Sequence, residues 1–167
     1  DKVTKEVVEA AKNLKIVVRA GAGFDNLDLE ACTAKGVVAM NTPGQNSNAV
    51  AELALGMMVY ISRNQFTAGT GAELKGKTLG IQAYGNVGRL VAKIAKGFGM
   101  NIMAFDPFLP AEKIEADDVT VAKDLDELYS KSNFVSLHIP ATPQTKKSIG
   151  YDLISKMPKG GCPVNTA

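Results

Sequence analysis

A glycine-rich turn with the chemistry of a phosphate-binding loop occupies residues 83–88, which read AYGNVG. In the pattern G-x-G-x-x-G, the first glycine permits a tight bend, the second lets the backbone approach a pyrophosphate, and the third lets a helix pack on a strand. Gly85 and Gly88 keep the last two roles, whereas Ala83 replaces the first glycine. We expect this replacement to cost little, provided that the backbone of Ala83 stays in an allowed region.

An acidic residue completes a candidate nucleotide site at the end of the next apolar stretch. Asp106 lies 18 residues beyond Gly88, where a carboxylate would accept hydrogen bonds from ribose hydroxyls. Pro107 and Phe108 follow it, and the absence of an arginine there favours NAD over NADP. Two other interpretations fit the same residues: a structural turn with a solvated aspartate, and an S-adenosylmethionine site.

Composition excludes several other classes of function. The 167 residues are 46% hydrophobic and 22% charged, with a net charge of +2, which argues against a nucleic-acid partner. The most apolar stretch, residues 49–61, contains Glu52 and is too short to cross a membrane. Cys32, Cys162 and the single His138 are too few and too scattered for a metal site, and two free thiols favour a reducing, cytoplasmic location.

Apolar periodicity predicts helices that alternate with strands, and therefore an α/β fold with a parallel sheet covered on both faces. In the first part, Thr4 can cap a helix, and strands 16–20 and 37–41 flank a short helix capped by Asp28. The later part continues with strands at 78–83, 101–105, 119–121 and 133–140, helices from 86, over 124–130 and 152–159, and a last apolar run at 162–167.

One helix differs from the others because it is apolar on most sides. It is expected over residues 49–61, after a cap at Asn46 or Ser47. Such a helix must be buried on most sides, which suggests a domain boundary or a subunit interface. The glycine- and threonine-rich residues 64–76 after it are expected to form a linker.

Four stretches, taken in their order and spacing, resemble the D-isomer-specific 2-hydroxyacid dehydrogenase family: VVRAGAGFDNLDLEACTAKG, MNTPGQNSNAVAELALGMM, LKGKTLGIQAYGNVGR and SNFVSLHIPATPQTKKSIG. The resemblance implies two α/β domains. Residues 1–63 would be part of a flavodoxin-like substrate domain with its crossover helix, and 77–167 an incomplete Rossmann-like NAD-binding domain. It also implies NAD as cofactor, a small-molecule substrate, and a homodimer or higher homo-oligomer formed through the 49–61 helix.

The same resemblance assigns candidate substrate-binding residues. It implies that the backbone amides of Ala22 and Gly23 hold the substrate carboxylate, that Asn46 lies near the substrate, and that Arg19 meets a substrate phosphate. Alternatively, Ala22 and Gly23 form only a turn at the end of a strand, Asn46 only caps a helix, and Arg19 is only a surface charge.

Candidate cofactor residues follow from the same similarity. The turn that binds the pyrophosphate would consist of Tyr84, Gly85, Asn86, Val87 and Gly88, and Asp106 would bind the adenosine ribose. The strand end beside the nicotinamide half would be His138, Ile139 and Pro140, and the next strand end would be Asn165, Thr166 and Ala167. Imidazole suits proton transfer near neutral pH. The resemblance nevertheless places His138 on the cofactor side and not at the catalytic position.

The family reaction is hydride transfer from C2 of a 2-hydroxyacid to nicotinamide. The resemblance implies that the catalytic Arg, Glu and His lie beyond Ala167, so we expect the 167-residue chain to be inactive alone. The pattern is most similar to members that oxidise 3-phospho-D-glycerate to 3-phosphohydroxypyruvate, the first step of serine biosynthesis. Glycerate or hydroxypyruvate-type reductases and NAD-sensing corepressors are the alternatives within the family.

Overall fold

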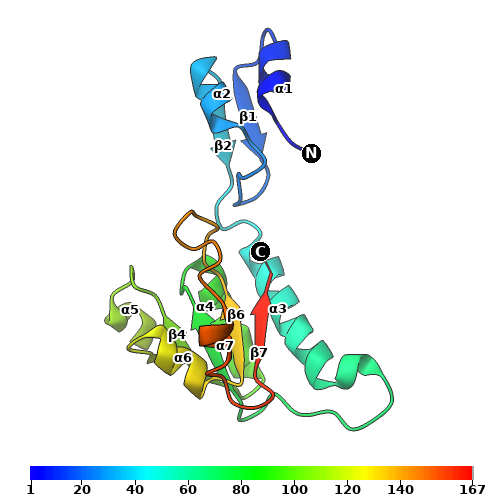
Figure 1. The fold of residues 1–167 in the computed structure, drawn as a ribbon, viewed down its shortest axis with the longest axis vertical. Coiled ribbons are helices and arrows are strands. Elements are labelled where there is room, and N and C mark those ends of the chain that lie inside the picture. Colours follow the sequence, from blue (N-terminus) through cyan, green and yellow to red (C-terminus); the bar gives the residue numbers. More distant parts are fainter. Residues whose placement is uncertain (167) are drawn as a thin grey trace. The chain divides into compact units, whose positions relative to one another are not determined.

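The computed structural model describes residues 1–166, which form two compact units (Figure 1). The first unit is Asp1–Asn46 and the second is Ser47–Ala167. Within residues 1–166, no helix is long and apolar enough to cross a membrane.

The first unit is a small parallel βαβ arrangement with one additional helix. Its elements are α1 (Lys5–Ala10), β1 (Ile16–Arg19), α2 (Leu29–Ala34) and β2 (Val38–Asn41). The two strands pair in parallel from Ile16 opposite Val38 to Arg19 opposite Asn41. Successive strand residues alternate between faces, so Val17 and Ala39 pack on the buried Val8, Cys32 and Val37. The opposite face is about half exposed and consists of Ile16, Val18, Val38 and Met40.

The helix ends of this unit differ partly from expectation. Asp28 caps α2 as predicted, because its carboxylate accepts a hydrogen bond from the Ala31 amide at 2.9 Å. Thr4 occupies the N-cap position of α1 but makes no capping bond, since its hydroxyl donates to Glu6 instead. At the other end of α1, the Lys35 ammonium donates to three main-chain carbonyls, those of Val8, Glu9 and Ala11.

The second unit contains a five-stranded parallel sheet in the order β5-β4-β3-β6-β7. The chain starts at β3, proceeds outward to β4 and β5, and then returns to β6 on the other side of β3. This reversal is the switch point at which open α/β sheets bind ligands. The elements are α3 (Ser47–Ser62), η1 (Asn64–Phe66), β3 (Thr78–Gln82), α4 (Asn86–Gly97), β4 (Asn101–Phe105), α5 (Ala111–Glu115), β5 (Thr120–Val121), α6 (Leu125–Lys131), β6 (Phe134–Leu137), α7 (Tyr151–Ile154) and β7 (Cys162–Asn165). The α/β class and the Rossmann-like sheet are therefore confirmed.

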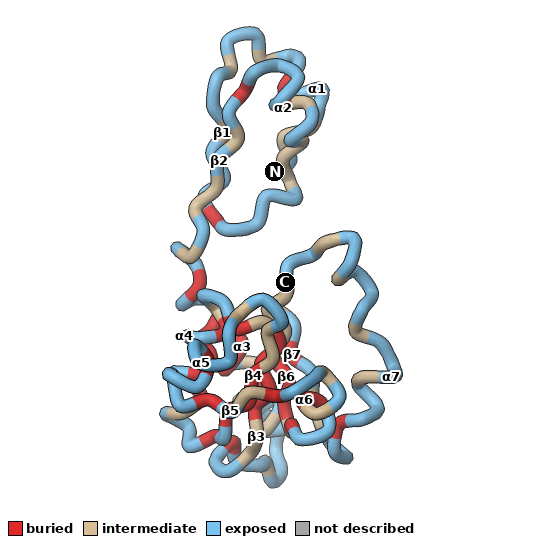
Figure 2. Tube along the Cα trace, turned by 90° about the vertical axis from the view of Figure 1, so that its left-hand side faces the viewer, coloured by how far each residue is buried: buried red, intermediate tan, exposed pale blue. Residues whose placement is uncertain are grey.

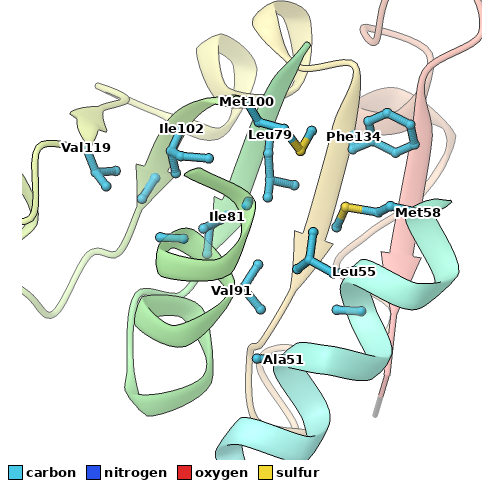
Figure 3. Close-up of a cluster of buried hydrophobic side chains, with 14 of the residues drawn as sticks. Ala51, Leu55, Met58, Leu79, Ile81, Val91, Met100, Ile102, Val119 and Phe134 are labelled. Carbon is cyan, nitrogen blue, oxygen red and sulfur yellow. The ribbon is translucent and has the colours of Figure 1, made fainter. Parts of the chain in front are cut away.

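Both faces of this sheet are covered by separate apolar clusters. On one face, Leu79 and Ile81 of β3 pack with side chains from α3 and α4, among them Leu55, Met58 and Val91 (Figure 3). The other face packs against α6 and the segment after α7, and the buried residues there are Met103, Leu128, Tyr129, Val135 and Met157. Strands buried on both faces account for their nearly continuous apolar sequences.

Helix α3 groups with the second unit, whereas the sequence division assigned it to the first part of the chain. The physical reason is that Ala51, Ala54, Leu55 and Met58 are buried against the sheet. The compact units therefore divide at Asn46. The assignment of residues 1–63 to a substrate domain and 64–76 to a linker stays a prediction about function.

Candidate cofactor site

The predicted cofactor residues lie at the carboxyl ends of four parallel strands. The turn 83–88 follows β3, Asp106 follows β4, His138 follows β6, and Asn165 ends β7. Main-chain hydrogen bonds join three of these ends, because Ala83 donates to the Phe105 carbonyl at 2.9 Å and His138 donates to the Gln82 carbonyl at 3.0 Å. The sheet thus brings these residues to one edge, whereas Ala167 falls outside the described residues.

The backbone of Ala83 departs from the expectation that it would stay in a favourable region. Its φ is +74°, which is in the left-handed region that glycine adopts without penalty. For a residue with a Cβ, this conformation costs about 1 kcal/mol. The tight bend therefore forms as in a glycine turn, but with stored strain at Ala83.

The two remaining glycines serve different purposes. A Cβ on Gly88 would lie 2.5 Å from the Ala83 carbonyl oxygen and 3.1 Å from Cγ2 of Ile81, so this glycine lets α4 pack on the strand, as predicted. A Cβ on Gly85 would meet no protein atom within 4 Å. Since Gly85 has an extended backbone, with φ of −82°, the fold does not require a glycine there. The open space beside it fits a ligand that approaches the backbone closely.

Helix α4 begins directly after Gly85 and directs its N-terminus toward the turn. Its first residue, Asn86, is exposed, and Val87 packs partly on the core. The amides of the first helical turn lack intrahelical acceptors and, with the helix dipole, favour an anion. The residues present therefore fit a bound pyrophosphate.

Tyr84 contributes only its main chain to this turn. Its side chain is 1% exposed, and its hydroxyl donates to Oδ2 of Asp117 at 3.1 Å. Burial and the nearby Asp117 carboxylate raise the pKa of Tyr84, and the Arg89 guanidinium lies 5.8 Å from the ring centroid. The phenol is thus part of the packing beneath the turn.

Asp106 connects the ends of β3 and β4. One carboxylate oxygen accepts the Tyr84 amide at 2.9 Å, and the other accepts the Phe108 amide at the same distance. These two bonds fix the carboxylate while each oxygen keeps further acceptor capacity. The geometry therefore suits the predicted hydrogen bonds from two ribose hydroxyls.

His138 follows β6 in a half-buried position. Its Nε2 lies 2.9 Å from the hydroxyl of the buried Ser136, and burial lowers the pKa of His138 to about 4. The imidazole is therefore neutral near pH 7 and poorly suited to accept a proton. Ile139 is half-buried, and the Pro140 carbonyl accepts a hydrogen bond from Thr145 that orders the following loop.

Comparisons with known proteins place this geometry in a family. Residues 47–167 match the D-isomer specific 2-hydroxyacid dehydrogenase, NAD binding domain. This chain belongs to the D-isomer specific 2-hydroxyacid dehydrogenase family. The resemblance and the cofactor expectation, NAD, are thereby confirmed at the level of the family.

Similar proteins are named for different activities. The chain is 43% identical to a D-3-phosphoglycerate dehydrogenase of Methanocaldococcus jannaschii, with 99% of this chain and 34% of the relative covered. It is also 43% identical to a hydroxypyruvate reductase of Thermotoga maritima, with 99% and 57% covered.

Solved structures give the same family. An NAD+-bound 3-phosphoglycerate dehydrogenase of Entamoeba histolytica has a TM-score of 0.89 and 49% identity, over 100% of this chain and 53% of that one. An Escherichia coli D-lactate dehydrogenase has a TM-score of 0.87 and 33% identity, over 99% and 57%. The chain thus spans between about a third and somewhat more than half of these proteins.

The candidate substrate residues of this family member lie in the first unit. Arg19 ends β1 and is exposed, and Ala22 and Gly23 are exposed in the turn that follows. Asn41 at the end of β2 donates through its side chain to the Ala22 carbonyl at 2.8 Å. Asn46 is exposed and precedes α3 directly. Arg19, Ala22 and Gly23 are therefore gathered near the carboxyl ends of one strand pair.

The sequence did not lead us to predict a role for two residues that shape these sites, Asn41 and Gln82. Asn41 orders the turn after β1, and only its place at a strand end signalled a role. Gln82, the last residue of β3, is 7% exposed and accepts a hydrogen bond from Tyr129. A glutamine within an otherwise apolar strand was a signal available in the sequence.

Proposed function

We propose that the intact protein binds NAD at the carboxyl edge of the second unit and oxidises 3-phospho-D-glycerate to 3-phosphohydroxypyruvate. The open space beside Gly85, at the N-terminus of α4, is the observation that carries the cofactor part. The similarity to 3-phosphoglycerate dehydrogenases supports the substrate.

The residues of this chain would bind and orient the cofactor. The turn 83–88 and the first turn of α4 would hold the pyrophosphate through main-chain amides. Asp106 would accept hydrogen bonds from the ribose hydroxyls, and residues 138–140, together with Asn165, Thr166 and Ala167, would flank the nicotinamide half. When bound, NAD would supply the nicotinamide ring that accepts a hydride from carbon C2 of the substrate.

The substrate would be held by the first unit. We propose that the amides of Ala22 and Gly23 bind the carboxylate and that Arg19 and Asn46 contribute polar contacts. We also propose that catalysis needs an Arg, a Glu and a His in addition to these residues, so NADH formation by the 167-residue chain alone would contradict this part.

A substrate panel tests the proposed reaction. NADH formation by the intact protein would be followed with 3-phospho-D-glycerate, D-glycerate and D-lactate, and we expect the highest kcat/KM for the phosphorylated acid. Preference for unphosphorylated D-glycerate would favour the hydroxypyruvate reductase activity, for which the Thermotoga relative of equal identity is the supporting observation. Arg19→Met should raise KM for the phosphorylated acid selectively, because it removes a cation.

We further propose that the protein forms a homodimer through α3 and is located in the cytoplasm. The face of α3 that does not contact the sheet leaves Leu53, Tyr60 and Ile61 between 42% and 55% exposed. Leu53→Lys should lower the mass measured by light scattering, whereas Leu29→Lys, at an exposed leucine of α2, should not. Unchanged mass in both variants would contradict the dimer surface.

A further inference from the structure

A buried polar pair lies directly beneath the glycine-rich turn. The hydroxyl of Tyr129, in α6, donates to Oε1 of Gln82, at the end of β3, with a distance of 2.8 Å. Tyr129 is fully buried and Gln82 is 7% exposed. Burial raises the pKa of Tyr129 to about 12, so its hydroxyl keeps the proton that it donates.

Gln82 is the residue immediately before the strained Ala83. Its own carbonyl accepts the His138 amide at 3.0 Å, and the next amide, of Ala83, donates to Phe105 at 2.9 Å. The main chain is thus held from β6 and β4, and the Gln82 side chain is held from α6. Contacts from β4, β6 and α6 therefore hold the chain at Gln82 and Ala83, where the backbone enters the left-handed conformation.

A strained backbone conformation persists only when its surroundings over-determine it. Ala83, at φ of +74°, lacks the freedom that a glycine would have in this bend. Removal of one anchor beside it should therefore let the turn relax toward conformations that suit an alanine. Such a relaxation would move the amides of the turn away from a bound pyrophosphate.

We propose that Tyr129 is a positioning residue for the cofactor, which holds the Ala83 turn in its binding conformation through Gln82. This role rests on the proposed binding of NAD at that turn. The competing explanation is purely structural: the tyrosine hydroxyl only satisfies a buried amide, which would otherwise lose its hydrogen bond.

The test combines Tyr129→Phe with Ala83→Gly in the intact protein and measures the Kd for NAD by titration. In the native background, Tyr129→Phe should raise Kd about fivefold to tenfold. In the Ala83→Gly background the same change should raise Kd less than about twofold, because a glycine adopts the bend without an anchor. Tyr151→Phe, at a tyrosine that is 85% exposed, is the matched control and should leave Kd unchanged.

A further variant keeps the test valid if Tyr129→Phe impairs folding. Tyr129→Phe with Gln82→Met replaces both partners by apolar groups of similar size, so no buried polar atom is left unpaired. A positioning role still predicts a raised Kd in this double variant. A native Kd in the double variant, or a Tyr129→Phe variant with lowered Tm and unchanged Kd, would overturn the proposal.

The variant Gly85→Ala distinguishes a wrong positioning role for Tyr129 from a wrong placement of the cofactor. If Gly85→Ala weakens NAD binding and Tyr129→Phe does not, the turn binds the cofactor and only the positioning role is wrong. If Gly85→Ala leaves Kd unchanged, the placement of the cofactor on this turn is wrong, and the positioning role fails with it.

Discussion

The two compact units bury their parallel sheets to different extents. In Ser47–Ala167, the five-stranded parallel sheet has an apolar cluster on each face, and buried residues run along β3, β4 and β6 (Figure 2). In Asp1–Asn46, two parallel strands are covered by helices on one face only, around a core of Val8, Cys32 and Val37. Equally apolar strands therefore contribute very differently to stability, since stabilisation follows the area removed from water.

Two methionines provide the strongest contrast between the units. Met58 in α3 is fully buried, whereas Met40 on the bare face of β2 is 50% exposed. Met58→Ala should lower the free energy of unfolding of the second unit by about 3 kcal/mol because it leaves a cavity. Met40→Ala should cost less than about 1 kcal/mol. Urea denaturation measures both, and equal losses would show that the bare face is covered in solution.

Acid should act on the second unit through His138, the one histidine of the sequence. Burial lowers its pKa from 6.5 to about 4, so between these values the unfolded chain binds a proton that the folded unit does not. Stability is therefore fully present above pH 6.5 and falls toward pH 4. The loss is on the order of 3 kcal/mol by linkage, since one pKa unit corresponds to about 1.4 kcal/mol.

His138→Gln is the control for this pH dependence, because it removes the titrating group. Its unfolding free energy should change little over the same pH interval. An imidazole that titrates near its ordinary pKa in NMR spectra would contradict the burial argument. Hydrogen exchange read separately in each unit should show the acid effect in the second unit alone.

Within the second unit, Gly85 and Gly88 lie in the same turn but have different surroundings. Gly88→Ala should cost about 1 to 2 kcal/mol of stability, because its Cβ would meet the Ala83 carbonyl. Gly85→Ala should change stability by less than about 0.5 kcal/mol. It should nevertheless raise the Kd for NAD about tenfold. Thermal unfolding with and without NAD measures both effects, and a large stability loss in Gly85→Ala would argue against a ligand-facing role.

A modest effect is expected at the end of helix α1 in the first unit. Lys35→Met removes an ammonium that donates to the carbonyls at the end of α1. We expect a loss of about 1 kcal/mol, read as faster hydrogen exchange of α1 amides. Lys12→Met, at an exposed lysine, is the matched control. Faster exchange in the second unit as well would mean that the two units unfold together.

Much of the fold followed from local patterns. Apolar runs that alternate with helical patterns predicted every strand of the two sheets. In the larger sheet, burial on both faces of the central strands accounts for these runs. The short helix α5 was not predicted, and α7 (Tyr151–Ile154) is shorter than the helix expected over 152–159, since short helices depend on tertiary contacts more than on propensity. The glycine pattern and its spacing predicted the turn 83–88 and Asp106, and the family resemblance predicted His138 and Asn165. The parallel strands place these candidate residues at one edge of the sheet.

Residue type and spacing were enough to predict the order of elements, the glycine-rich turn and the acidic residue after the next strand. The positive φ of Ala83, the burial of the Tyr84 ring and the hydrogen bond from Tyr129 to Gln82 became known only from the folded structure. Backbone conformation at a single residue and contacts across 47 positions are set by packing between elements that one stretch of sequence does not contain.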